Sequence, residues 1–146
     1  MPTGPVTHGK AWIEMLHRYL ATGVGALITV LAVTAWLEAR RQRSTSTMAV
    51  SPWWPTVTWL WVCGQGAFGA LTVTMKLYPA IVTLHLLGGL GLLALLAIQS
   101  QLPRRSTLVL STALRRGVVA VLGLAVVQTT LGGWVSTNYA VLACAE

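Results

Sequence analysis

The chain has 146 residues, of which 55% are hydrophobic and only 9% are charged, and its formal net charge is +7. Because soluble domains carry about 25% charged residues, this composition excludes an ordinary soluble domain and predicts a small membrane-embedded helical bundle. The positive charge does not indicate nucleic-acid binding, since most arginines lie in two stretches between apolar segments and are not interleaved with aromatic residues.

Four apolar segments predict four transmembrane helices, because each has the ~20 residues needed to cross the hydrocarbon core. They cover residues 11–39, 55–75, 80–101 and 112–135. Arginines gather in the connections at 40–54 and 102–111 and at the start of the fourth helix. The positive-inside rule makes these connections cytoplasmic. The predicted fold class is therefore an all-α polytopic membrane bundle, one domain over 1–146, with both termini outside.

Two pairs of segments indicate an internal repeat. HRYLATGVGAL, from His17, can be laid over HLLGGLGLLAL, from His85. QGAFGALTVT, from Gln65, can be laid over QTTLGGWVST, from Gln128. Together the matches predict a duplicated two-helix unit, which is common in membrane folds.

His17 and His85 each lie six residues into a predicted helix that runs from outside to inside, counted from Ala11 and Pro79. At 1.5 Å per residue both lie roughly 9 Å below the outer helix ends. Glycines follow each histidine and are expected to leave room for a flat macrocycle. Two imidazoles at one depth are typical axial ligands of haem iron, so we predict that His17 and His85 bind haem. Histidines that only hydrogen-bond helices together are the alternative.

Glu14 lies three residues before His17 and shares its helix face. The residue pattern leaves two roles open for it: neutralisation by Arg18 at i+4, or proton transfer beside the haem. Arg18, Lys10 and Lys76 all lie near the outer level and are candidates for pairing with haem propionates, although snorkelling to the interface is the default for a lysine.

The remaining histidine and the two cysteines are not predicted to form a metal site. His8 is expected in a solvated loop before the first helix. Cys63 and Cys144 have neither a metal-ligand spacing nor a disulfide framework, and Cys63 is expected to serve packing.

Three of these stretches resemble one protein family. WIEMLHRYLATGVG (12–25) resembles the Glu-x-x-His-Arg segment of the heme A synthase family. GQGAFGALTVTMKLYPAIVTLHLLGG (64–89) is similar to the segment from its third into its fourth helix, and QTTLGGWVSTNYAVLAC (128–144) to its fifth helix and the following loop. The resemblance implies a membrane oxidoreductase of two similar four-helix halves, which oxidises a methyl group of haem O to the formyl group of haem A for cytochrome oxidase assembly.

The resemblance also implies roles and partners. His17 and His85 match the histidine pair of the first half, and Glu14 matches the family's acid, with a role in proton handling. The cofactor is haem, as haem O substrate or haem b. The oxygen of the formyl group comes from water, so the reaction needs an electron acceptor. The expected location is the inner (plasma) membrane of a bacterium. The chain corresponds to helices two to five, so the missing helices or a haem O synthase are expected partners. Cys144 matches the first cysteine of an outer-loop pair.

Two other functions stay open on the residues alone. One is a bis-histidine b-type cytochrome that transfers electrons, for which Glu14 would be dispensable. The other is a haem-free assembly or scaffold protein, in which the histidines only join helices.

Overall fold

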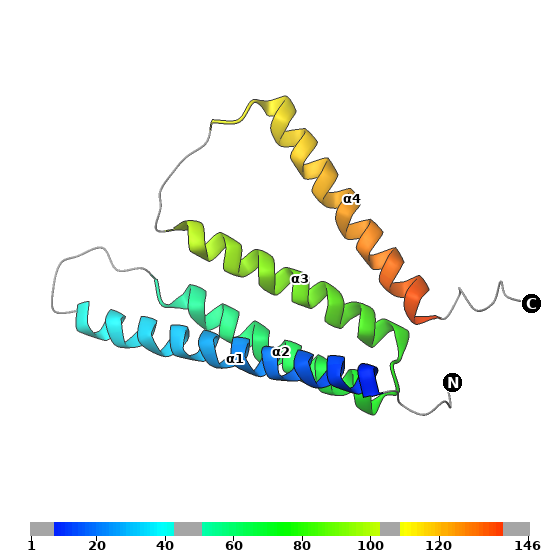
Figure 1. Ribbon diagram of the computed structural model, residues 1–146. Coiled ribbons are helices and arrows are strands. Elements are labelled where there is room, and N and C mark those ends of the chain that lie inside the picture. The colour runs from blue at the N-terminus through cyan, green and yellow to red at the C-terminus, as the bar shows by residue number, and fades with distance from the viewer. Residues whose placement is uncertain (1–7, 43–50, 103–108, 139–146) are drawn as a thin grey trace, which may run out of the picture. The chain divides into compact units, whose positions relative to one another are not determined.

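The computed structural model describes residues 8–42, 51–102 and 109–138, and the regular structure within them is all helical (Figure 1). The predicted all-α class is thus confirmed. The helices are α1 (His8–Gln42), α2 (Trp53–Thr74), α3 (Pro79–Gln101) and α4 (Thr112–Thr137).

The helix ends follow from local chemistry. α3 begins at Pro79, a favourable first position because proline presets φ and that N–H has no helical partner. Ser111 caps α4, its hydroxyl accepting a hydrogen bond from the backbone N–H of Leu114 at 3.3 Å. α1 begins at His8, so the expectation that His8 lies in a loop before the first helix is wrong.

Within the described residues, three helical stretches are long and apolar enough to cross a membrane: Ala11–Arg41, Pro79–Gln101 and Thr112–Thr137. The chain is therefore a membrane protein. α2 has 22 residues but is not among the three, because its tryptophans, threonines and glutamine lower its mean hydropathy. A fourth span and the outside location of the termini stay predictions. Arg43, Arg104, Arg105 and Cys144 lie outside the described residues.

The chain divides into two compact units, Met1–Leu60 and Trp61–Glu146, so that α2 contributes residues to both. In the first unit, α1 packs against the beginning of α2 through tryptophans. The rings of Trp36 and Trp53 meet edge to face at 5.8 Å. Trp36 Nε1 donates to the hydroxyl of Thr56 at 2.8 Å, and Trp59 Nε1 donates to the hydroxyl of Thr29 at 3.2 Å. These bonds tie α1 to the beginning of α2, and the two segments run antiparallel there.

In the second unit, α3 contacts both α4 and the later part of α2. The contact with α4 forms at Gly133, where an added Cβ would lie 3.3 Å from Leu86 and 3.6 Å from Thr83. The turn between α2 and α3 contains two successive left-handed residues, Lys76 (φ 52°) and Leu77 (φ 62°). It is closed by a hydrogen bond of 2.8 Å from the Leu77 N–H to the Thr72 carbonyl, and this reversal lets α3 return along α2.

Candidate functional site

His85 lies six residues into α3 and is half-buried. Its ring lies against the backbone of α2 at Gly69. A Cβ added to Gly69 would lie 3.3 Å from Cε1 of the ring and 3.8 Å from Nε2. The ring therefore occupies the space that the missing side chain of Gly69 leaves free. Nδ1 of the ring is a buried atom.

The same face of α2 makes two further contacts with α3. One turn before Gly69, the amide of Gln65 lies against Gly88, where any added Cβ would overlap it. One turn earlier still, Trp61 Nε1 donates to the Gly88 carbonyl at 2.9 Å, and its ring lies against Gly91. We call these contacts the α2–α3 seam.

The seam consists of Trp61, Gln65 and Gly69 on α2, and His85, Gly88 and Gly91 on α3. Its α2 members have i, i+4, i+8 spacing, which places them on one helix face. Sequence reasoning missed the roles of Trp61, Gln65 and Gly69. The available signal was the Gln-x-x-x-Gly spacing of QGAFG, quoted above only as half of a repeat.

The predicted role of the glycines after His85 is wrong for two of them. The sequence suggested that Gly88, Gly89 and Gly91 leave room for a macrocycle. Gly88 and Gly91 are instead covered by side chains of α2, because glycine lets two helices approach closely enough for large side chains to fill the gap. Gly89 has nothing within 4 Å of an added Cβ, and the same holds for Gly23 and Gly25 after His17.

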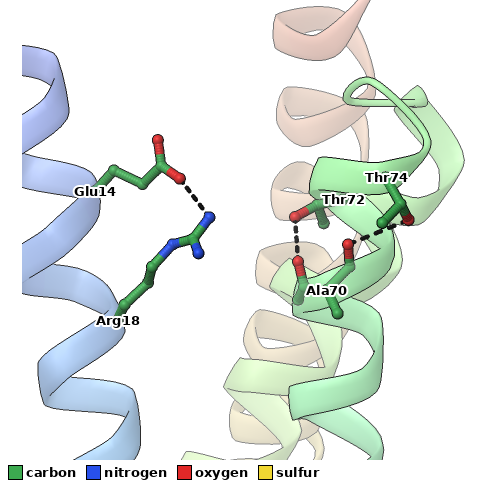
Figure 2. A network of polar contacts seen from close by, with 6 residues as sticks. Glu14, Arg18, Ala70, Thr72 and Thr74 are labelled. Carbon is green, nitrogen blue, oxygen red and sulfur yellow. Dashed lines mark hydrogen bonds and ion pairs between the residues drawn. The ribbon is translucent and has the colours of Figure 1, made fainter.

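Glu14 and Arg18 form an ion pair on α1 (Figure 2). Arg18 Nη2 donates to Glu14 Oε1 at 2.6 Å, and both side chains are 59% exposed. Of the two roles that the sequence left open for Arg18, the structure contains the pairing with Glu14. His17, one turn after Glu14, is exposed. It lies nine residues after the first residue of α1, but six after the start of the apolar stretch at Ala11.

The other predicted site residues are placed as follows. Lys76 is exposed in the left-handed turn that leads into α3. Lys10 is in α1, but its side chain is outside the described part. His17 and His85 belong to different units, so their equal depth and their pairing around one iron stay predictions.

The predicted donors are the imidazoles of His17 and His85. Among the described residues, no group of three or more histidine, cysteine, aspartate or glutamate side chains could hold an ion. A haem iron needs only axial ligands from the protein, and imidazole is a common one. A cavity of about 270 Å³ between α3 and α4 is lined by Leu77, Val82, Ser136 and Thr137, and contains none of the predicted site residues.

Comparison with known proteins gives a consistent family. The sequence pattern of the family described as "cytochrome oxidase assembly protein" matches residues 2–146. The heme A synthase of Shewanella oneidensis is 37% identical over 98% of this chain and 42% of its own length. The heme A synthase of Halalkalibacterium halodurans is 28% identical over 100% of this chain and 48% of its own length. The chain thus spans less than half the length of both curated relatives. No solved structure matches the chain.

Proposed function

The chain belongs to the cytochrome oxidase assembly protein family, and on this premise we propose that it is the part of a heme A synthase that holds haem O and oxidises a methyl group on it to the formyl group of haem A. The observation that carries the proposal is its 37% identity to a heme A synthase over 98% of the chain. Because that relative is more than twice as long, the proposal concerns the contribution of this portion.

Two histidines would bind the haem in this proposal. His17 and His85 would each offer one imidazole nitrogen to the iron. For His85, the contact with Gly69 supports the assignment, since the ring lies against α2 there and its rotation towards α2 is limited. Arg18 and Lys76 would pair with the propionates, Arg18 while it also holds Glu14.

Glu14 would handle protons. It lies one turn before His17 on α1, and its carboxylate is held by the Arg18 guanidinium at 2.6 Å. When bound, haem O supplies the methyl carbon that is oxidised, with the new oxygen coming from water. Loss of hydrogen from that carbon requires a nearby base, and the Glu14 carboxylate is the candidate for this role.

The oxidation also requires partners. Electrons removed from the methyl carbon must pass to an acceptor, which is a further protein or a small molecule in the bilayer. The apolar helices indicate a membrane protein, and we propose the plasma membrane of a bacterium, as the two bacterial relatives suggest. The missing helices of the synthase, or a haem O synthase, would adjoin this portion.

Haem content tests the proposal. The chain is expressed, purified in mild detergent and examined by absorbance and by a pyridine haemochrome assay, beside His17→Ala and His85→Ala. We expect a low-spin bis-histidine spectrum that both substitutions abolish while the protein stays helical and monodisperse. A folded wild-type protein without haem would contradict the proposal and favour a scaffold role.

One observation favours a second candidate, a b-type cytochrome that only transfers electrons. The ion pair with Arg18 gives Glu14 a structural partner, so that its presence does not require chemistry. The two functions differ in whether haem O supplied to the protein is converted to haem A.

A further inference from the structure

The α2–α3 seam contains a residue whose contact with His85 bears on how this histidine can bind iron. We propose that Gly69 is a positioning residue: its lack of a side chain holds the His85 imidazole in the orientation in which it ligates haem. This inference rests on the proposed function, because it assumes that His85 is a ligand.

The distances define which edge of the ring faces α2. Measured from a Cβ placed on Gly69, Cε1 lies at 3.3 Å, Nε2 at 3.8 Å and Nδ1 at 4.0 Å. Carbon is thus the nearest ring atom, and both nitrogens lie farther from the glycine. The ring is in close contact with the helix backbone on one side, so rotation towards Gly69 is blocked. Such a contact limits the rotation of the ring, and contacts of this kind are one means by which the surroundings of a metal-binding histidine orient it.

The backbone of α2 is itself held in place around Gly69. The hydroxyl of Thr72, which is labelled in Figure 2, donates to the Gly69 carbonyl at 2.6 Å. Two turns earlier, the indole of Trp61 donates to the Gly88 carbonyl at 2.9 Å, and Gln65 lies between these contacts against Gly88. Because α2 and α3 are joined on this face, a methyl group added at Gly69 cannot be relieved by separation of the helices. The His85 ring has to move.

Gly66 provides a matched control. It lies on α2 only three residues from Gly69, and nothing is found within 4 Å of a Cβ placed there. Gly66→Ala therefore adds the same methyl group and the same gain in helix propensity without touching His85. Any effect that Gly69→Ala shows and Gly66→Ala lacks is due to the contact with the ring.

The experiment uses the full chain in mild detergent, loaded with haem b as the probe. Haem affinity, the g values of the oxidised low-spin haem and its midpoint potential are measured for wild type, Gly69→Ala and Gly66→Ala. We expect Gly69→Ala to shift the g values and to weaken affinity about 5-fold, the low end of what overpacking costs, because the ring has to give by only a few tenths of an ångström, with Gly66→Ala equal to wild type. Affinity and g values unchanged in Gly69→Ala would overturn the inference.

A second measurement needs no variant. In the haem-free wild-type protein, a nuclear Overhauser cross-peak is expected between the Gly69 Hα protons and the His85 Hε1 proton, and its absence would overturn the inference even if Gly69→Ala does not fold. Haem binding by wild type and by His85→Ala shows whether the proposed function itself fails. In that case wild type binds no haem, or binds it unchanged in His85→Ala, and the positioning role is overturned together with the function.

Discussion

Glu14 is the residue at which an enzyme and an electron carrier differ. The ion pair with Arg18 at 2.6 Å accounts for its presence without chemistry, and i, i+4 pairs of this kind contribute about 0.3–0.5 kcal/mol at a helix surface. A charged group at membrane depth is costly, at about 2.5–3.5 kcal/mol at the centre of a span. The pair offsets only part of that cost if it enters the hydrocarbon, so these energies do not separate the two roles, and a measurement of haem O conversion does.

Glu14→Gln separates these roles because glutamine keeps the shape and removes the base. We expect haem binding to stay within about twofold of wild type, since glutamine can still accept a hydrogen bond from Arg18. Conversion of added haem O to haem A should fall roughly 10²–10⁴-fold, the usual contribution of a proton-transfer residue. The measurement is chromatography of extracted haem after incubation with haem O.

Glu38→Gln is the control for this experiment, because Glu38 is another carboxylate on α1 but lies twenty-four residues farther along. It should leave conversion unchanged. Conversion that is equal in Glu14→Gln and wild type would remove Glu14 from the mechanism and leave it as the partner of Arg18.

The individual side chains were only partly predictable. The pairing of Glu14 with Arg18 is one of the alternatives that their spacing leaves open, and it is present in the structure. The contact of His85 with Gly69 joins residues on two helices that are apolar on all sides. In such helices the sequence period does not indicate which face meets a neighbour, so the contact required the packed structure.

At the scale of the elements, the pairing of α1 with the beginning of α2 depends on threonine hydroxyls that both donate and accept a hydrogen bond. The Thr29 hydroxyl donates to the Gly25 carbonyl at 2.8 Å in its own helix and accepts from Trp59 Nε1 across the interface. Interhelical hydrogen bonds matter in membranes because lipid does not drive apolar helices together as water does.

Thr29→Val tests this interhelical bond. Valine keeps the size and removes the acceptor, so the indole N–H of Trp59 loses its partner. We expect the free energy of unfolding, measured in detergent by titration with a denaturant, to fall by about 0.5–1.5 kcal/mol. Thr34→Val is the matched control, because the Thr34 hydroxyl bonds only to the Val30 and Leu31 carbonyls of its own helix. Equal losses in the two variants would show that the Trp59 bond contributes nothing.

The helix ends show what hydropathy can and cannot predict. The four apolar segments gave four helices, because a run of about twenty apolar residues favours a helix whose backbone bonds are internal. α1 nevertheless continues past the predicted end at residue 39 to Gln42. Arg40, Arg41 and Gln42 are polar but are good helix formers, so the helix ends later than hydropathy alone predicts.

At the scale of the whole molecule, the exposed apolar surface is the main feature. None of the residues of α4 is buried, and α1 exposes large side chains such as Trp12, Leu27 and Leu37. A soluble domain rarely leaves such surface uncovered, whereas lipid or further transmembrane helices cover it at no cost. Lipid is therefore a neighbour that the apolar helices themselves indicate.

The membrane topology of the chain depends on whether α2 crosses the bilayer. If α2 crosses the bilayer, Ser51 before it and Tyr78 after it lie on opposite sides, with the arginine-rich connections inside. If its tryptophans hold it at the interface, both residues lie on the same side.

Single cysteines distinguish these arrangements. The background is Cys63→Ser, Cys144→Ser. Ser51→Cys and Tyr78→Cys are each treated with a membrane-impermeant maleimide in cells whose outer membrane is permeabilised and whose inner membrane is intact. We expect Tyr78→Cys to react at once and Ser51→Cys to react only after the inner membrane is permeabilised. Labelling of both from outside, or of neither, would mean that α2 does not cross the membrane. The helices that bear His17 and His85 would then enter from opposite sides, and the equal depth on which their pairing depends would be lost.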